Sequence, residues 1–330
     1  MADATSRSQR ILITGGSGFV GTNLIRTLLA AGWADIVSLD TDVNNGSSDE
    51  RVRRFVADIR DRDAVAQAIE GVDWVVHAAA VGARRQRREV TSTNAVGTRI
   101  VLEAALRRHV DRVVFLSTAA VYGVPDRLLV TEDHPLSGAG AFSAAKIRGE
   151  QLCEDSRARG ACVTVLRPQP CVRNGRGNGF HRLFRRIAEG RWVPVIGSAL
   201  NRWQLVDVQD LSDAILLCLT ADRAVANDTF NIGAPDCGSL REDIQALIDS
   251  ADSGARIVRQ PIRATLLCLS APGTLRVSPL LRSVSETSTG EACLSIERAT
   301  ERLGFRPRFS SREALLRGYK WYLKARRCCR

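Results

Sequence analysis

A glycine-rich stretch near the start of the chain has the residue types and spacing of a phosphate-binding turn. The sequence ITGGSGFVG places Gly15, Gly18 and Gly21 three residues apart, directly after a short apolar run and at the start of a helical pattern. The first glycine permits a tight turn, the second lets a diphosphate approach the backbone, and the third lets the helix pack close to the strand. Free N–H groups at the start of the helix would then bind the phosphates. A flexible turn without a ligand is the alternative interpretation.

An acidic residue, Asp40, ends the second predicted strand. Its carboxylate can accept hydrogen bonds from the adenosine ribose hydroxyls, and it would repel a 2′-phosphate. The neighbouring Thr41 and Asp42 add no positive charge, so the pattern favours NAD over NADP. Asp58 and Ile59, which end the third predicted strand, are predicted to meet the adenine. An aspartate in a turn that binds no ligand remains the alternative for Asp40.

Short β-branched runs alternate with longer amphipathic segments over the first half of the chain. Strands are predicted at 11–14, 35–40, 53–58, 73–79, 111–118 and 162–168, and helices at 18–31, 61–70, 94–108 and 142–159. Strands that are apolar on both faces are typical of a buried parallel sheet. The sequence therefore predicts an α/β fold with a Rossmann-type doubly wound parallel sheet.

The pattern becomes irregular after Pro168, with a further strand at 228–235 and helices near 239–250, 295–303 and 311–325. We predict an NAD-binding core at residues 10–167, completed by about residues 203–234. Residues 168–202 and 235–330 are predicted to form a smaller C-terminal substrate-binding lobe.

The composition argues against several classes of protein. The formal net charge is +11, yet no aromatic-interleaved basic motif or helix-turn-helix pattern supports nucleic-acid binding. Nine scattered cysteines without a CxxC pair argue against a disulfide framework and a structural zinc site, and the four histidines lie far apart. We therefore expect no metal, and we expect the adjacent Cys328 and Cys329 to be exposed thiols in a reducing compartment. Neither a long apolar run nor an apolar signal core is present, so we expect no membrane span and a cytoplasmic protein.

Nine short motifs along residues 10–325 together resemble the extended short-chain dehydrogenase/reductase family, the NAD-dependent epimerase/dehydratase group. They are TGGSGFVG, HAAA (77–80), NAVGT (94–98), STAAVYG (117–123), FSAAK (142–146), LRP (166–168), NRWQLVDVQD (201–210), FNIG (230–233) and RLGFRP (302–307). The resemblance implies a Rossmann core with a small substrate lobe and tightly held NAD. It also implies a homodimer through the helices at about 94–108 and 142–159.

By position in these motifs, Thr118 looks like the family's catalytic Ser/Thr, and Lys146 like the lysine that binds the nicotinamide ribose. Phe19, Val20, Ala78 and Ala79 are likewise implied to contact the cofactor. Asn94 and Arg167 are expected to be structural. Ala119 and Ala120 stand where the sugar 4,6-dehydratases have an Asp-Glu pair, which argues against that reaction.

The chain departs from the family at the residue that usually transfers the proton. A tyrosine is expected four residues before Lys146, but Phe142 occupies the position. Phenylalanine keeps the ring but has no ionisable group, and loss of general acid–base help typically costs ~10²–10⁴-fold. Candidate replacements are Thr118, Ser143, Lys146 itself, Tyr122 or a water molecule. Three explanations remain open: a natural enzyme that needs no tyrosine, an enzyme altered by design to hold its substrate, or an NAD-binding relative with little catalysis.

Several residues are predicted to bind an anionic substrate. They are Arg84 in GARRQRREV, Arg173 in the Gly/Asn/Arg loop, Tyr122, Arg202 and Trp203, with a solvated arginine face or ordinary packing as the alternative. The best function is epimerase- or ketoreductase-like chemistry on a nucleotide-diphosphate sugar. The alternatives are a short-chain dehydrogenase/reductase acting on a specialised metabolite, and a catalytically weak NAD-binding regulatory protein.

Overall fold

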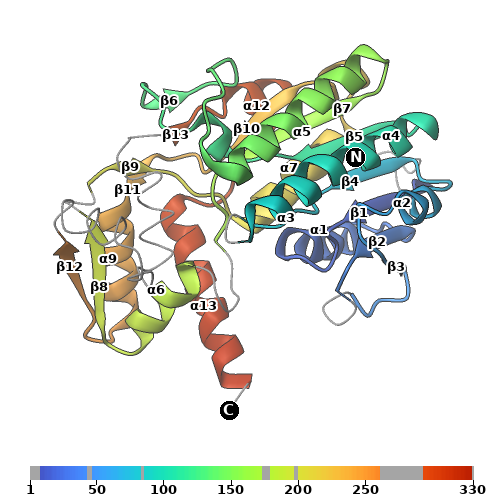
Figure 1. The fold of residues 1–330 in the computed structure, drawn as a ribbon. Helices are drawn as coiled ribbons and strands as arrows, with labels where there is room; N and C mark the ends of the chain where they lie inside the picture. Colours follow the sequence, from blue (N-terminus) through green and yellow to red (C-terminus); the bar gives the residue numbers. More distant parts are fainter. Residues whose placement is uncertain are drawn as a thin grey trace.

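The computed structural model describes residues 8–42, 47–82, 85–172, 179–196, 200–260 and 293–328. The predicted substrate residues Arg84 and Arg173 lie outside these ranges. Figure 1 shows an α/β lobe that contains a large sheet, with a smaller lobe beside it that contains the C-terminal helix.

Seven parallel strands form the sheet, in the order β10-β7-β5-β4-β1-β2-β3. Their bounds are β1 Ile11–Thr14, β2 Ile36–Asp40, β3 Val52–Val56, β4 Trp74–His77, β5 Arg112–Leu116, β7 Val163–Pro168 and β10 Thr229–Ile232. The predicted doubly wound sheet is confirmed, and each predicted strand lies within a few residues of an observed one. The predicted domain boundaries remain a prediction, although β10 falls inside the range expected to complete the core.

Alternation along the strands explains why both faces of the sheet are covered. In β1, Ile11 and Ile13 join one apolar cluster, whereas Leu12 joins the cluster on the opposite face. The helices of the first face are α1 (Phe19–Ala30), α7 (Val208–Thr220) and α12 (Glu297–Arg302), and those of the second are α2 (Arg62–Ala68), α4 (Thr98–Arg107) and α5 (Gly140–Ala158). Helices α4 and α5 pack against each other, and a homodimer through them stays a prediction.

The helix expected at 94–108 begins earlier than the sequence predicted. It opens as α3 (Arg87–Thr91), continues as a π-helical stretch over Ser92–Gly97, and then becomes α4. Single π-helical turns within longer helices frequently occur at functional sites. Asn94 lies in this stretch and binds both backbone groups of Val81, accepting from its N–H and donating to its carbonyl at 2.9 Å each. The expected structural role of Asn94 is confirmed, because it fixes the loop that follows β4.

The smaller lobe has its own apolar core. Its described elements are α6 (Gly179–Ala188), β8 (Trp192–Ile196), β9 (Arg202–Trp203), β11 (Gly238–Ser239), α9 (Leu240–Ala251), β12 (Arg256–Gln260) and α13 (Ser311–Cys328). The remaining described elements are short: a 3₁₀ turn over Ala119–Tyr122, β6 (Leu129–Val130), α8 (Arg223–Ala226) and β13 (Cys293–Leu294), which pairs with β6. No helix among the described residues has the length and apolar character that a membrane span requires.

Candidate active site

The glycine turn between β1 and α1 is built so tightly that side chains would not fit. Gly15 has a φ of 74°, and a Cβ placed on it would lie 2.8 Å from the backbone of Ala79. A Cβ on Gly21 would lie 2.2 Å from the carbonyl oxygen of Gly15. The turn is closed by a hydrogen bond of 3.0 Å from Gly18 N to Gly15 O. The predicted roles of Gly15 and Gly21 in a tight turn therefore agree with the geometry.

Backbone donors are available at the start of α1. The first bond of the helix runs from Thr22 N to Gly18 O at 2.9 Å, so the N–H groups of Phe19, Val20 and Gly21 precede it. These donors, the positive end of the helix dipole and the bare backbone around Gly15 fit a dinucleotide diphosphate. The residues present therefore fit NAD.

Asp40, the last residue of β2, lies beside this turn. Its carboxylate accepts from Ser17 N at 3.0 Å and from Asp42 N at 3.1 Å. A cavity of about 300 Å³ opens beside it, and its lining consists of Ser17, Ser38, Asp40, Asp42, Arg54, Phe55 and Val56. Because this cavity lies beside the glycine turn, it suits the adenosine half of a dinucleotide. The three β3 residues, Arg54, Phe55 and Val56, were not predicted to lie here, because a short strand carries no local signal for which of its side chains face a ligand.

The two residues expected to meet adenine have other contacts in the structure. Asp58 pairs with Arg60 at 2.6 Å, and this hydrogen-bonded guanidinium lowers the pKa of the carboxyl. Ile59 is buried, and a Cβ on Gly97 of the π-helical stretch would lie 2.6 Å from its side chain. The Ile59 side chain therefore belongs to the core, and a contact with adenine through these two residues stays a prediction.

A buried histidine, His77 of β4, links the end of β1 to the start of α4. The His77 ring lies 2.7 Å from Thr14 Oγ1 through Nδ1 and 2.9 Å from Thr98 Oγ1 through Nε2. Ala79 N, one of the predicted cofactor contacts, donates to the same Thr14 hydroxyl at 3.3 Å. Burial lowers the pKa of His77 from 6.5 to about 3, with a smaller contribution from the Lys146 charge. His77 is therefore neutral in the folded protein.

This burial predicts that acid destabilises the fold through His77. The folded pKa lies below the unfolded one, so the stability is present above pH 6.5 and is lost as the pH falls towards about 3. Each pH unit inside this window costs about 1.4 kcal/mol. Urea unfolding at pH 6 and pH 5 should show a loss about 1 kcal/mol larger in the native protein than in His77→Gln. Equal losses in the two proteins would contradict this role.

The residues expected to do the chemistry lie at the carboxyl end of β5 and on α5. The Thr118 hydroxyl accepts from Ala120 N at 3.2 Å and leaves its proton free for a substrate oxygen. Lys146 is buried, and its Nζ donates to the carbonyl of Leu116 at 2.6 Å. Burial lowers the pKa of the ammonium group to about 8. Thr118 and Lys146 are thus both attached to the end of the same strand, as the motifs imply.

Phe142 lies one turn before Lys146 on α5 and is partly buried. It packs in a small apolar cluster with Val81, Val90, Ala95, Ala141 and Ala145. Ser143, a candidate replacement for the missing tyrosine, is buried, 6% exposed. The ring position is therefore preserved by packing, while the hydroxyl that would transfer a proton is absent.

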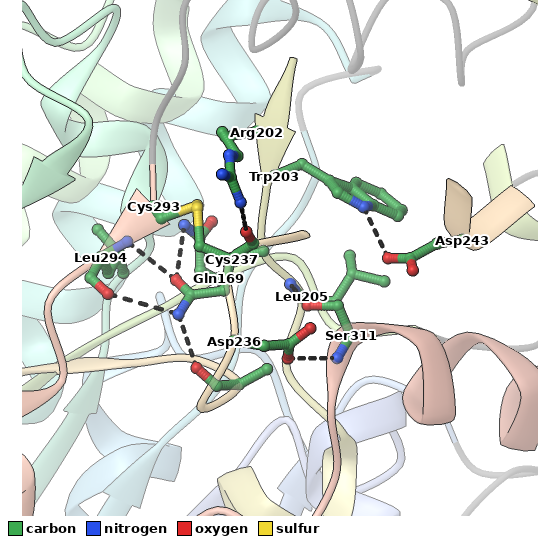
Figure 2. Close-up of a disulfide and its surroundings, with 12 residues drawn as sticks. Gln169, Arg202, Trp203, Leu205, Asp236, Cys237, Asp243, Cys293, Leu294 and Ser311 are labelled. Atoms are coloured by element: carbon green, nitrogen blue, oxygen red, sulfur yellow. Dashed lines mark hydrogen bonds between the residues drawn. A yellow bond between two sulfur atoms is a disulfide. The ribbon is translucent and has the colours of Figure 1, made fainter. Parts of the chain in front are cut away.

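The smaller lobe presents two of the predicted substrate residues beside a disulfide (Figure 2). Arg202 is exposed and donates to the carbonyl of Cys237 at 2.7 Å. Trp203 is partly buried and donates through its indole N–H to Asp243 at 2.9 Å. Arg202 keeps an exposed guanidinium available for an anion, whereas the Trp203 indole is engaged in the packing of its lobe.

The expectation that the cysteines carry no disulfide is wrong for one pair. Cys237 and Cys293 are bonded, with their Cα atoms 5.9 Å apart. Among the other described cysteines, Cys153, Cys162 and Cys218 are buried free thiols. The bond joins positions 56 residues apart, on β13 and just before β11, so local spacing carried no signal for it. No cluster of metal-binding side chains occurs in the described part of the chain.

A buried polar network lies at the carboxyl ends of β5 and β7. The guanidinium of Arg167 forms an ion pair with the carboxylate of Glu150 at 2.6 Å, and that carboxylate also accepts a hydrogen bond from the Ser117 hydroxyl. Arg167 donates to the Tyr122 hydroxyl at 2.8 Å, and that hydroxyl donates to Asn231 at 2.7 Å. Burial raises the pKa of Tyr122 to about 12. Tyr122 is therefore a core residue, which corrects our prediction that it contacts substrate and removes it as a proton donor.

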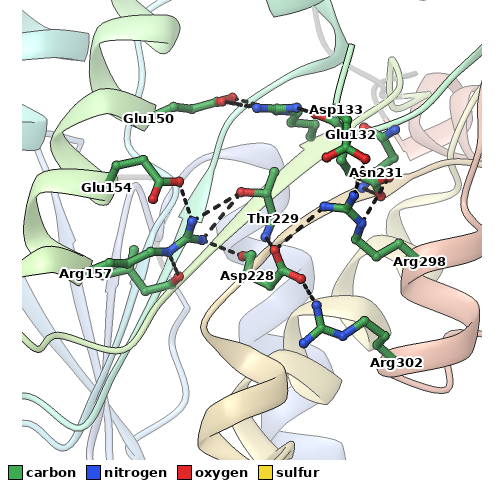
Figure 3. Close-up of polar contacts among 12 residues, drawn as sticks. Glu132, Asp133, Glu150, Glu154, Arg157, Asp228, Thr229, Asn231, Arg298 and Arg302 are labelled. Carbon is green, nitrogen blue, oxygen red and sulfur yellow. Dashed lines mark hydrogen bonds and ion pairs between the residues drawn. The ribbon is translucent and has the colours of Figure 1, made fainter. Parts of the chain in front are cut away.

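The network continues to α12 at the edge of the sheet. Figure 3 shows Arg298 and Arg302 of α12 directed towards the acidic side chains around β10. Arg298 pairs with Asp133 at 2.7 Å and with Glu132 at 3.6 Å, and Arg302 pairs with Asp228. These contacts hold the β10 edge, and through Asn231 they support the turn that begins at Thr118.

Removing the central carboxylate charge should weaken the fold strongly. Glu150→Gln leaves the buried Arg167 guanidinium without its counter-charge, which typically costs ~3–5 kcal/mol. The matched control is Glu103→Gln, which breaks the exposed pair with Arg62 and should cost ~0–1 kcal/mol. Urea unfolding of the three proteins measures both values, and equal losses in the two variants would contradict the structural role of Glu150.

Residues 11–233 match the model of the NAD dependent epimerase/dehydratase family. The chain is 32% identical over 314 residues to an uncharacterized protein of Sinorhizobium fredii, covering 94% of this chain and 78% of the relative. It is 31% identical over 338 residues to a dTDP-glucose 4,6-dehydratase of Streptomyces niveus, covering 95% and 92%.

The fold is similar to that of the dTDP-glucose 4,6-dehydratase of Streptomyces venezuelae, whose structure has NAD and TYD bound. The TM-score is 0.76 at 26% identity, over 97% of this chain and 98% of that one. The likeness therefore includes the smaller lobe as well as the large sheet.

Proposed function

This chain belongs to the NAD-dependent epimerase/dehydratase family, and we propose that it performs epimerase- or ketoreductase-like chemistry on a nucleotide-diphosphate sugar. The observation that carries the proposal is the placement of Thr118 and Lys146 at the end of β5, in a sheet whose first turn is shaped for a dinucleotide. Members of the family depend on NAD, and many act on nucleotide sugars.

When bound, NAD would supply the hydride chemistry: the oxidised form takes a hydride from a carbon of the substrate, and the reduced form gives one back. Phe19, Val20 and Gly21 would hold its diphosphate, and Asp40 its adenosine ribose. The Thr118 hydroxyl would donate a hydrogen bond to the reacting oxygen. The proton that this oxygen loses on oxidation, or gains on reduction, would be exchanged with a water molecule or with Lys146. Lys146 would bind the nicotinamide ribose, and its ammonium group would stabilise negative charge that develops on that oxygen.

Elimination of water, the dehydratase reaction, is not part of the proposal. The positions of the Asp-Glu pair are Ala119 and Ala120, at the start of the 3₁₀ turn after Thr118. Methyl groups there can neither give nor take a proton. This absence favours transfer of hydride alone, as in an epimerase or a ketoreductase.

The second candidate is redox chemistry on a specialised metabolite. Its support is that both departures, at Phe142 and at Ala119–Ala120, fall on groups that handle protons in the sugar enzymes. A substrate with a more acidic hydroxyl needs less help with its proton. The third candidate, an NAD-binding protein with little catalysis, rests on Phe142 alone.

A substrate panel separates these candidates. The purified protein is incubated with NAD and UDP- and dTDP-sugars, or with NADH and their 4-keto forms, and products are identified by chromatography and mass spectrometry. A parallel panel contains secondary alcohols and ketones without a nucleotide. New sugar isomers or reduced keto-sugars support the proposal, and turnover only in the second panel supports the metabolite candidate. Cofactor binding without any turnover would overturn both in favour of a binding protein.

A further inference from the structure

The C-terminal helix reaches the cofactor turn of the other lobe. Trp321 of α13 lies against Phe19, with ring centroids 5.9 Å apart and an angle of 32° between the planes. Phe19 is the first residue of α1. Figure 1 shows α13 on the side of the smaller lobe that is nearer to α1. Residues some 300 positions apart therefore meet at the diphosphate end of the predicted NAD site.

Helix α13 is fixed firmly in the smaller lobe. Leu315, Tyr319 and Tyr322 are buried in the core of that lobe. A Cβ on Gly318 would lie 2.4 Å from Val172, so the helix packs there without a gap. Trp321 is therefore presented to Phe19 by a helix that is anchored in the core of the smaller lobe.

The same face of α13 also forms an ion pair with the residue that caps the start of α7. Arg317 precedes Trp321 by one turn and pairs with Asp207 at 2.9 Å. Asp207 caps α7 by accepting from Gln209 N at 2.8 Å. The Arg317 guanidinium also lies 3.9 Å from the centre of the Phe309 ring. One helical face thus makes two contacts with helices that cover the large sheet: a polar one with the start of α7 and an aromatic one with α1.

Phe19 takes part in both the aromatic contact and the phosphate turn. Its side chain packs on Trp321, and its backbone N–H is among the donors that precede the first bond of α1. Movement of the smaller lobe away from α1 must break the ring contact. Release of a bound dinucleotide must break the backbone contacts of the same residue.

We propose that Trp321 and Phe19 form an aromatic latch that keeps the smaller lobe against the phosphate turn and slows the release of NAD or NADH. The proposal rests on the cofactor assigned under the proposed function, but it does not depend on the sugar substrate. Aromatic pairs contribute about 0.5–1.5 kcal/mol beyond the area that they bury, and 1.4 kcal/mol corresponds to a tenfold change.

The test measures the dissociation rate of NADH by stopped flow, with excess NAD to trap the free protein. Trp321→Leu should release NADH about tenfold faster than the native protein, and Trp321→Phe, which keeps a ring, should remain close to native. Trp192→Leu is the matched control. Trp192 is also an exposed tryptophan, 69% against 42% for Trp321, but it lies on β8 within the smaller lobe.

A double-mutant cycle checks that the two rings act together. If they form one latch, Phe19→Leu combined with Trp321→Leu should release NADH no faster than the faster single variant. Additive effects, or an unchanged rate in Trp321→Leu, would overturn the latch. A native protein that binds no NADH would instead overturn the cofactor assignment, so the two failures can be told apart. Thermal unfolding of each variant confirms that α13 remains folded.

Discussion

Replacing Phe142 by tyrosine is expected to raise the turnover of a nucleotide sugar by about 10²–10⁴-fold, the usual contribution of general acid–base catalysis. Phe142 and Lys146 are one helical turn apart on α5, so a tyrosine hydroxyl would share a helix face with the ammonium group. That positive charge would lower the pKa of the new phenol and favour proton transfer. Because Phe142 is only partly buried, the hydroxyl need not be enclosed in the apolar cluster.

The matched control for this change is Phe142→Leu, which removes the ring without adding a proton donor. It should show no gain, and it reports any change caused by altered packing against Val90 and Ala95. Initial rates are measured for the three proteins at saturating NAD across pH 6–10. A tyrosine variant that is no faster than the native protein would mean that another group already transfers the proton. Lys146, whose pKa is lowered to about 8, would then be the first residue to test.

Gly21→Ala is expected to weaken NADH binding by about 10- to 100-fold. Its Cβ would lie 2.2 Å from the Gly15 carbonyl and 2.6 Å from the Cα of Gly16, so the turn must shift. Inserting an atom into a well-packed site costs about 1–3 kcal/mol, and 1.4 kcal/mol is a tenfold change in affinity. The shift moves the backbone donors of Phe19 and Val20, which precede the first bond of α1. Fluorescence titration with NADH measures the loss.

Gly82→Ala provides the comparison for this loss. A Cβ at Gly82 would meet nothing within 4 Å, and its φ is not positive, so affinity should stay within about twofold of native. Unfolding in urea shows how much of the Gly21→Ala effect is general destabilisation. Native affinity in Gly21→Ala would contradict the assignment of this turn to the dinucleotide.

The parts of the fold that could be predicted are those encoded by neighbouring residues. The runs ILI (11–13) and VVFL (113–116) are apolar at every position because both faces of each strand are covered by helices. The glycine turn was predictable for a similar reason, since its spacing within seven residues is itself the constraint. Thr118 and Lys146 required the family resemblance as well, because neither residue type indicates chemistry by its local pattern.

The errors concern residues whose roles depend on distant partners. Tyr122 follows Thr118 closely and was predicted to contact substrate, but Arg167 and Asn231 hold its hydroxyl in the core. The Cys237–Cys293 bond and the contact between Phe19 and Trp321 likewise join remote positions. Arg54 lines the cavity beside Asp40 from β3, whose short sequence carries no local signal for a ligand contact. A contact with a remote segment produces no periodic pattern in the local sequence, so the local sequence could not reveal these roles.

The order of strands in the sheet also has a consequence for synthesis of the protein. Strand β10 closes the edge beside β7, yet it is made only after α6, β8 and β9 of the smaller lobe. A nascent chain that has emerged only to Pro168 therefore carries β7 as an unpaired edge, which is prone to join other chains. At that stage the acceptor of the Tyr122 hydroxyl, Asn231, has not yet been translated. The nucleotide-binding half cannot mature during translation until the ribosome has passed Ile232, and a shortened gene that ends before Thr229 would encode an aggregation-prone product.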